Sequence, residues 1–158
     1  MSENLTTENT VQYAGFWRRF LAYIVDWAVL TVLGIFLVIG YSMFLAFMGN
    51  DLGDEASVLM FQAQAKLLTF LMAWLYYAVM ESSAKQATLG KLALGIKVTS
   101  LQGESISFLR ASVRFFSKIL SALLFFIGFI MIAFTEKKQG LHDMIAGAIV
   151  IKRESSKA

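Results

Sequence analysis

The chain has 158 residues, enough for one domain, of which 58% are hydrophobic and only 16% are charged. A soluble domain usually carries about 25% charged residues, so this composition indicates a small polytopic membrane protein rather than a soluble one. The sequence contains no cysteine, which excludes disulfides and thiolate metal sites, and its net charge of +3 is unevenly distributed along the chain.

The first hydrophobic segment follows a polar, mildly acidic tail, Met1–Tyr13. The tail has no basic stretch, so we expect no cleaved signal peptide and a retained first segment. The segment predicts a helix from near Ala14 to about Phe44–Met48. About 20 apolar residues cross a hydrocarbon core of ~30 Å, so this helix is long enough to span with tilt or with an exposed outer end.

Asp26 is the only charged residue between Phe20 and Met48. A carboxylate inside a membrane segment costs at least ~2.5–3.5 kcal/mol, so it marks either a functional site or half of a buried pair. Arg19 lies seven residues earlier on the same helix face and is the expected partner. The other candidate partners are Lys66, Arg110, Arg114 or a loop from elsewhere in the chain.

An acidic break, Gly49–Ser57, separates the first hydrophobic segment from a second one, Val58–Met80. The break has three acidic residues and no Lys or Arg. We interpret it as a solvated turn rather than a divalent metal site. In the second segment, Lys66 either extends to the outer interface or faces partner helices together with its neighbouring glutamines.

The region Glu81–Arg114 is basic and contains two predicted short strands, Gly95–Thr99 and Ser105–Phe108, around a Leu-Gln-Gly-Glu turn. A third β-branched run, Ala148–Lys152, lies near the C-terminus. Thr88–Lys91 lacks the preceding glycine of a phosphate-binding loop, so we do not expect nucleotide binding.

The third hydrophobic element is Phe115–Phe134, and an amphipathic stretch, Phe108–Lys118, overlaps its start. Arg110, Arg114 and Lys118 recur every four residues, which places them along one helix face. They are candidate ligands of lipid headgroups, although the usual excess of basic residues on the cytoplasmic side explains most of them equally well.

The distribution of Lys and Arg predicts a cytoplasmic N-terminus and a cytoplasmic Glu81–Arg114 region. A third full crossing would export the basic C-terminal residues, so we expect a re-entrant or interfacial element and a cytoplasmic C-terminus. Ala148–Lys152 can then pair with Gly95–Thr99. The predicted fold is an all-α membrane protein with two transmembrane helices, a third partial or re-entrant hydrophobic helix, and a small cytoplasmic β element.

Three motifs in order, Arg18–Asp26, Thr88–Val98 and Gln139–Gly147, resemble the RDD family of membrane proteins over about Tyr13 to Lys152. The family is named for one arginine and two aspartates, and the resemblance assigns these to Arg19, Asp26 and Asp143. It implies a bacterial cytoplasmic membrane protein with a suspected role in transport. It also implies a single membrane domain over residues 14–152, flanked by tails at 1–13 and 153–158.

Asp26, Arg19, Asp143 and His142 are therefore the candidate ion- or proton-binding residues. Asp26 would titrate, Arg19 would modulate it, and His142 could relay protons near neutral pH. The structural alternative is a fixed carboxylate at Asp26, with Asp143 capping a short helix or binding Arg110 or Arg114.

The leading functional hypothesis is transport of a small ion or solute, such as exchange of a monovalent cation for a proton. The alternative is a non-transporting membrane module that scaffolds, assembles or regulates a partner through its cytoplasmic face. We expect no catalytic residues, no cofactor, no enzymatic activity and no nucleic-acid partner. Two spans are too few to enclose a pathway, so we expect a homo-oligomer in contact with membrane lipids, with close helix approach at Ala22, Gly34 and Gly40.

Overall fold

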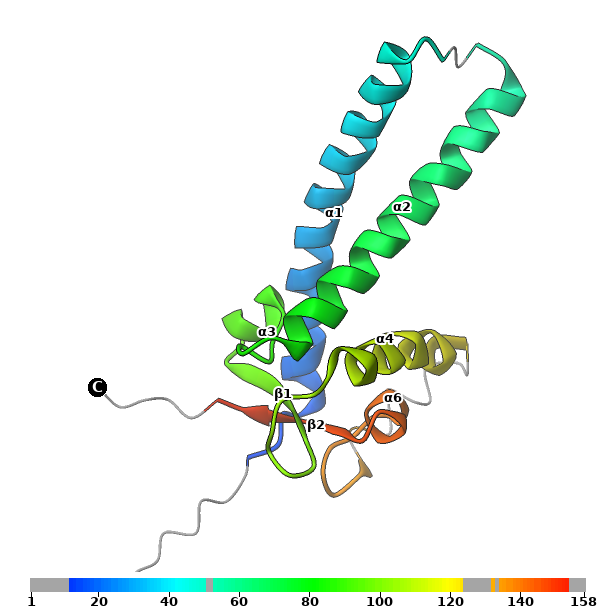
Figure 1. The fold of residues 1–158 in the computed structure, drawn as a ribbon. Helices are drawn as coiled ribbons and strands as arrows, with labels where there is room; N and C mark the ends of the chain where they lie inside the picture. The colour runs from blue at the N-terminus through cyan, green and yellow to red at the C-terminus, as the bar shows by residue number, and fades with distance from the viewer. Residues whose placement is uncertain (1–11, 51–52, 124–131, 133, 154–158) are drawn as a thin grey trace, which may run out of the picture.

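The computed structural model describes residues 12–50, 53–123, 132 and 134–153. Two long helices, α1 (Phe16–Phe47) and α2 (Glu55–Ser82), form a hairpin. All the shorter elements gather at one end of it, near the start of α1 and the end of α2 (Figure 1). They are α3 (Leu89–Ala93), β1 (Ile96–Ser100), α4 (Phe108–Leu123), α6 (Leu141–Ile145) and β2 (Ala148–Lys152). We call this group of five elements the basal unit.

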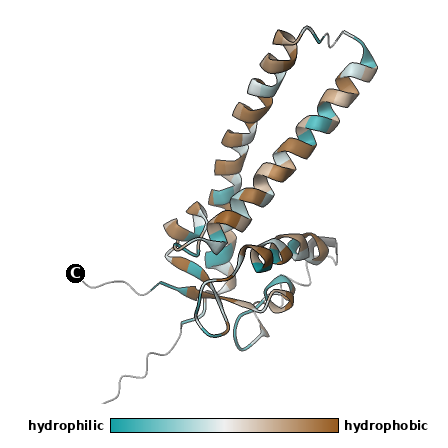
Figure 2. Ribbon diagram, in the orientation of Figure 1, coloured by the Kyte–Doolittle hydropathy of each residue, from teal (hydrophilic) through white to brown (hydrophobic). Residues whose placement is uncertain are grey.

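Both helices of the hairpin are largely apolar, as the brown segments in Figure 2 show. Phe36 and Phe47 are exposed by 70% and 82%, and in each helix almost none of the most apolar window is buried. An apolar helix that is the core of a soluble protein would be covered by its neighbours, whereas these two are not. With 32 and 28 residues, both are long enough to be membrane spans. This confirms the two predicted transmembrane helices.

α2 begins three residues before the predicted Val58, because Asp54 caps it. The Ser57 amide donates to Asp54 Oδ1 at 2.8 Å, and the Ser57 hydroxyl donates to Asp54 Oδ2 at 2.8 Å. Asp54, one of the three acidic residues of the predicted solvated turn, is therefore the N-cap of α2.

The basal unit is built on an antiparallel pair of strands. β1 pairs with β2 in the register Ile96↔Lys152, Val98↔Val150 and Ser100↔Ala148. The start of the chain joins them, since the Ala14 amide donates to the Val150 carbonyl at 2.8 Å. The predicted pairing of the C-terminal strand is thus confirmed, and that strand lies at the same end of the hairpin as the Glu81–Arg114 region.

The predicted strand Ser105–Phe108 is wrong. Residues 105–107 form neither helix nor strand, and Phe108 is the first residue of α4. The edge of β1 that such a strand would need is already used, because the Val98 amide donates to the Gln86 carbonyl at 2.7 Å. The preceding turn is confirmed, with the Gly103 amide donating to the Ser100 carbonyl at 3.0 Å.

α4 lies across the base of the hairpin and packs against α2 through aromatic rings (Figure 1). Trp74 of α2 contacts Phe108 and Phe116, with ring centroids 5.9 and 6.1 Å apart. α4 contains the first part of the predicted third hydrophobic element. Residues 124–131 and 133 of that element lie outside the described residues.

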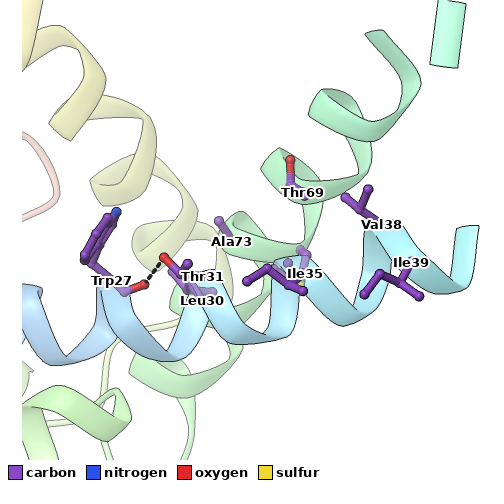
Figure 3. A pocket seen from close by; sticks show the side chains of 10 residues that line it. Trp27, Leu30, Thr31, Ile35, Val38, Ile39, Thr69 and Ala73 are labelled. Carbon is purple, nitrogen blue, oxygen red and sulfur yellow. Dashed lines mark hydrogen bonds between the residues drawn. The ribbon is translucent and has the colours of Figure 1, made fainter. Parts of the chain in front are cut away.

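An open groove of about 590 Å³ separates α1 from α2 further along the hairpin (Figure 3). Its walls are almost entirely apolar, and its two hydroxyl groups are bonded within their own helices. Thr31 donates to the Trp27 carbonyl at 2.8 Å, and Thr69 donates to the Ala65 carbonyl at 2.9 Å. The groove therefore offers a lipid-like surface rather than a set of ion ligands.

Candidate functional site: two polar centres at the base of the hairpin

The first polar centre surrounds Asp26, whose side chain is only 1% exposed. Its Oδ1 accepts from the Tyr76 hydroxyl at 2.7 Å and from the Gly90 amide at 2.8 Å, and its Oδ2 accepts from the Thr88 hydroxyl at 2.6 Å. These donors come from α2 and from the start of α3. The carboxylate thus joins three helices, and both of its oxygens have donors.

The start of α3 is shaped to meet this carboxylate. Thr88 is the N-cap residue of α3, and the amides of the first turn of a helix have no partner within the helix. A Cβ atom on Gly90 would overlap the Ala22 carbonyl oxygen and would lie 2.9 Å from Asp26 Oδ1. Only glycine lets α3 approach α1 this closely. The sequence Thr-Leu-Gly therefore has a definite role that is unrelated to phosphate binding.

Arg19 does not pair with Asp26, contrary to the expected pairing. Its guanidinium makes an ion pair with Asp143 of α6 and donates to the Lys138 carbonyl at 2.6 Å and the Ala14 carbonyl at 3.0 Å. Asp26 instead accepts hydrogen bonds from Tyr76 of α2 and from Thr88 and Gly90 at the start of α3. Among the predicted alternatives, this corresponds to a loop from elsewhere in the chain. Seven residues along a helix place two side chains on one face but about 10.5 Å apart, which is too far for direct contact.

The second polar centre is organised by Arg114 of α4, which is 2% exposed. Its Nε donates to Asp143 Oδ1 at 2.7 Å, and its Nη1 donates to Glu81 Oε2 at 2.6 Å. One guanidinium therefore bridges a carboxylate from α2 and a carboxylate from α6. The predicted alternative in which Asp143 binds Arg114 matches this geometry, and Asp143 also accepts from the Gly140 amide at 3.3 Å.

Two lysines complete the charge pattern on the Glu81 side. Lys91 of α3 makes an ion pair with Glu81 Oε1, and Lys118 Nζ lies 3.7 Å from the same oxygen. Lys118 also sits over the Tyr77 ring, 4.2 Å from its centroid. With Arg19 and Arg114, four cationic side chains surround the two carboxylates.

Burial and charge together set the pKa values outside the two spanning helices. Burial alone would raise the pKa of Asp143, but Arg114 and Arg19 outweigh it and hold that pKa well below its usual range. Burial lowers the pKa of His142 to about 3, against the pull of Asp143. Burial also lowers the pKa of Lys91 to about 7, and the charge of Arg114 acts in the same direction, against Glu81.

The structure thus brings together three of the four residues proposed for ion or proton binding. Arg19, His142 and Asp143 share the second centre, with His142 Nε2 3.4 Å from Asp143 Oδ1, while Asp26 has its own centre. His142 is buried, and its lowered pKa keeps it neutral near pH 7, which is a poor setting for a proton relay.

Sequence reasoning missed several residues that hold these centres together. Glu81 directly follows the uncharged run Leu67–Met80, and that position was a signal for a second carboxylate at the membrane boundary. Thr88, Gly90 and Lys91 stand in a family motif whose structural role was not predicted, and the Tyr76 hydroxyl does not stand out in an apolar run. The missed residues are Tyr76, Glu81, Thr88, Gly90 and Lys91. Within the part of the chain that the structure describes, no group of three His, Asp or Glu side chains could hold a metal ion.

Comparisons with known proteins agree with this architecture. The sequence profile described as the RDD family matches residues 13–147. The chain is 42% identical to the uncharacterized protein YxaI of Bacillus subtilis (strain 168) over 146 residues, which cover 87% of this chain and 96% of that protein. It is 34% identical to the uncharacterized membrane protein YteJ of the same organism over 148 residues, which cover 90% and 82%. No solved structure matches. The chain is therefore an integral membrane protein that belongs to the RDD family.

Proposed function

We propose that this protein is a membrane-anchored scaffold, in which the two polar centres fix the basal unit rigidly against the helical hairpin so that it can present a stable face to a partner. The observation that carries the proposal is the burial of Asp26 with hydrogen-bond donors on both of its carboxylate oxygens. A carboxylate that is 1% exposed and accepts three hydrogen bonds of 2.6–2.8 Å is positioned to hold helices together.

The same geometry disfavours cation–proton exchange through Asp26. An exchanging carboxylate needs lone pairs open to the ion and an aqueous route by which the ion arrives. A cation that binds Asp26 would have to fit among the Tyr76 hydroxyl, the Thr88 hydroxyl and the Gly90 amide, all of which donate to the carboxylate. The groove between α1 and α2 supplies few replacement ligands, because its lining is apolar apart from the Thr31 and Thr69 hydroxyl groups.

The second centre supports the same role. Removing one member of a buried ion pair costs about 3–5 kcal/mol, because a buried charge is left without its partner. The second centre ties α1, α2, α3, α4 and α6 together through such pairs. Every short helix of the basal unit is thus linked electrostatically to the hairpin.

The proposed orientation places the basal unit and the N-terminus in the cytoplasm. The basic residues concentrate at this end of the hairpin, whereas the sequence Gly49–Ser57 between the two long helical runs is acidic and has no Lys or Arg. The proposed partner surface is therefore cytoplasmic. A homo-oligomer stays a prediction. Of its three expected contact residues, Ala22 is buried against Gly90 and Gly34 faces α2. A Cβ built at Gly40 would meet no described atom of another element within 4 Å.

Ion flux in proteoliposomes tests the proposal, with the wild type and Asp26→Asn compared at equal protein content. We expect both to give the background Na⁺ and H⁺ flux of protein-free vesicles, and we expect Asp26→Asn to lower the yield and thermal stability of folded protein. A clear wild-type flux that Asp26→Asn abolishes without any change in stability would overturn the scaffold assignment and restore the transport hypothesis.

A further inference from the structure

α4 is an inverted amphipathic helix. Its buried residues are small or polar, and the helix packs against α2 and α6, with Arg114 reaching the second polar centre. These buried residues are Ala111, Ser112, Arg114, Ser117 and Ser121. The opposite face is apolar and exposed, with Leu109 at 73% and Phe116 at 47%. A helix in water has the reverse arrangement, so the outer face of α4 is suited to an apolar surrounding.

α6 extends this apolar surface. Met144 and Ile145 are about half exposed, and a groove of about 360 Å³ runs between them and Leu109 and Val113 of α4. Arg110 lines the same groove. Its side chain is exposed, and within the described ranges its guanidinium makes no ion pair. The groove thus combines apolar walls with one accessible cation.

The apolar surface of α4 continues onto the membrane-spanning hairpin. Phe116 contacts Phe70 and Trp74 of α2, with ring centroids 6.3 and 6.1 Å apart. Phe70 is itself exposed and belongs to the apolar outside of α2. The ring contacts between α2 and α4, together with the apolar groove between α4 and α6, indicate that the same lipid layer covers all three helices.

We propose that the groove between α4 and α6 binds an anionic phospholipid from the leaflet that surrounds the base of the hairpin. An acyl chain lies against Leu109, Val113 and Met144, and the lipid phosphate accepts hydrogen bonds from Arg110. This site is independent of the scaffold role, since neither polar centre contributes a ligand to it.

The geometry also narrows the three headgroup ligands predicted from the sequence to one. Arg114 is buried and binds both Glu81 and Asp143, so its guanidinium is already used. Lys118 is held near Glu81 and over the Tyr77 ring. Of the three residues, only Arg110 makes no ion pair within the described part of the chain.

Spin labels at single cysteines test whether lipid covers this surface, and the absence of native cysteine makes the labelling clean. Labels go on Leu109→Cys and Met144→Cys in proteoliposomes, with Leu101→Cys as the control, because Leu101 is 48% exposed in the turn after β1. We expect oxygen, which concentrates in lipid, to relax the first two labels, and a water-soluble nickel chelate to relax the control. If all three labels respond to the chelate alike, the surface faces water or a soluble partner and the lipid site is refuted.

Lipid retention measured by native mass spectrometry tests the role of Arg110. The wild type, Arg110→Gln and Arg18→Gln are taken from vesicles that contain phosphatidylglycerol. Arg18 is a matched control because it is an exposed arginine at the same end of the hairpin. We expect Arg110→Gln to reduce phosphatidylglycerol retention about fivefold and Arg18→Gln to leave it unchanged. Equal loss in both variants, or displacement of the lipid by inorganic phosphate, would overturn the site.

Discussion

At the scale of single residues, Asp26 shows how a buried charge is kept in a membrane protein. Its isolation within an apolar helix identified it in the sequence, because an unpaired carboxylate is too costly to retain there by chance. Its partners were not predictable. Thr88 and Gly90 lie 62 and 64 residues away along the chain, and one of the donors is a backbone amide that any residue could supply.

The tyrosine pair on α2 tests the hydrogen bonds to Asp26. Tyr76 donates to Asp26, whereas the buried Tyr77 hydroxyl has no hydrogen-bond partner among the described residues. Tyr76→Phe should lower the free energy of unfolding by about 1.5–3 kcal/mol, as expected for loss of a bond to a charged group. Tyr77→Phe should leave it unchanged or raise it slightly. Thermal unfolding in detergent measures both, and equal effects would argue against a special role for Tyr76.

Gly90 tests the close approach of α3 to α1. Gly90→Ala places a methyl group against the Ala22 carbonyl and Asp26, so we expect a loss of at least about 1–3 kcal/mol in unfolding free energy. Gly40→Ala is the control, because a Cβ there meets no atom within 4 Å and alanine favours a helix. Stability of Gly90→Ala equal to that of the control would show that α3 does not lie where the structure places it.

At the scale of secondary-structure elements, α4 has a polar face that packs inside the basal unit and an apolar face that is exposed. The four-residue spacing of Arg110, Arg114 and Lys118 correctly indicated a helix, but it did not reveal that the middle arginine turns inward. That orientation depends on the carboxylates of α2 and α6, which are far away in sequence. Periodicity along one element therefore predicts its shape, and its partners decide which side is buried.

Substitutions of two arginines on α4 separate its faces. Arg114→Met leaves Glu81 and Asp143 without their shared cation, so we expect a loss of about 3–5 kcal/mol in unfolding free energy. Arg110→Met removes an exposed charge, and the change should stay within about 0.5 kcal/mol. Chemical unfolding in detergent micelles provides the comparison. A small effect of Arg114→Met would mean that the second centre does not hold the basal unit.

α6 should make the protein sensitive to mild acid through His142. Burial lowers the pKa of His142 from 6.5 to about 3. Between about pH 6.5 and pH 3, the imidazole is therefore protonated in the unfolded chain and neutral in the folded chain. Stability contributed by the neutral imidazole is full above about pH 6.5. It falls by about 1.4 kcal/mol for each pH unit below that. Asp143 adds to the loss only near and below its ordinary pKa of 3.8.

The pH dependence of thermal unfolding from pH 7 to pH 4 measures this effect. The wild type should lose stability steadily on acidification, and His142→Gln should have a shallower slope because it has no imidazole to protonate. Identical slopes for the two proteins would show that His142 is solvated or already charged in the folded state.

At the scale of the whole molecule, hydropathy predicted the membrane hairpin. The charge distribution predicted that the Glu81–Arg114 region and the strand Ala148–Lys152 lie at the same end of it. Hydropathy and charge distribution are averages over many residues, so a wrong interpretation of one residue does not change the prediction. The β1–β2 pairing followed from the same reasoning. The predicted strand Ser105–Phe108 failed because local alternation says nothing about whether the neighbouring sheet edge is available. The two polar centres depend on long-range contacts. The sequence singled out Arg19, Asp26, Arg114 and Asp143, but it missed Glu81 and Lys91 and did not give the pairing.

The arginine and the two aspartates of the family form two separate structural centres, with Arg19 bound to Asp143 and not to Asp26. Double-mutant cycles on the free energy of unfolding test it most directly. Arg19→Gln should couple with Asp143→Asn by about 1 kcal/mol or more, and with Asp26→Asn by less than about 0.5 kcal/mol. Strong coupling between Arg19 and Asp26, with additive effects at Asp143, would contradict the account.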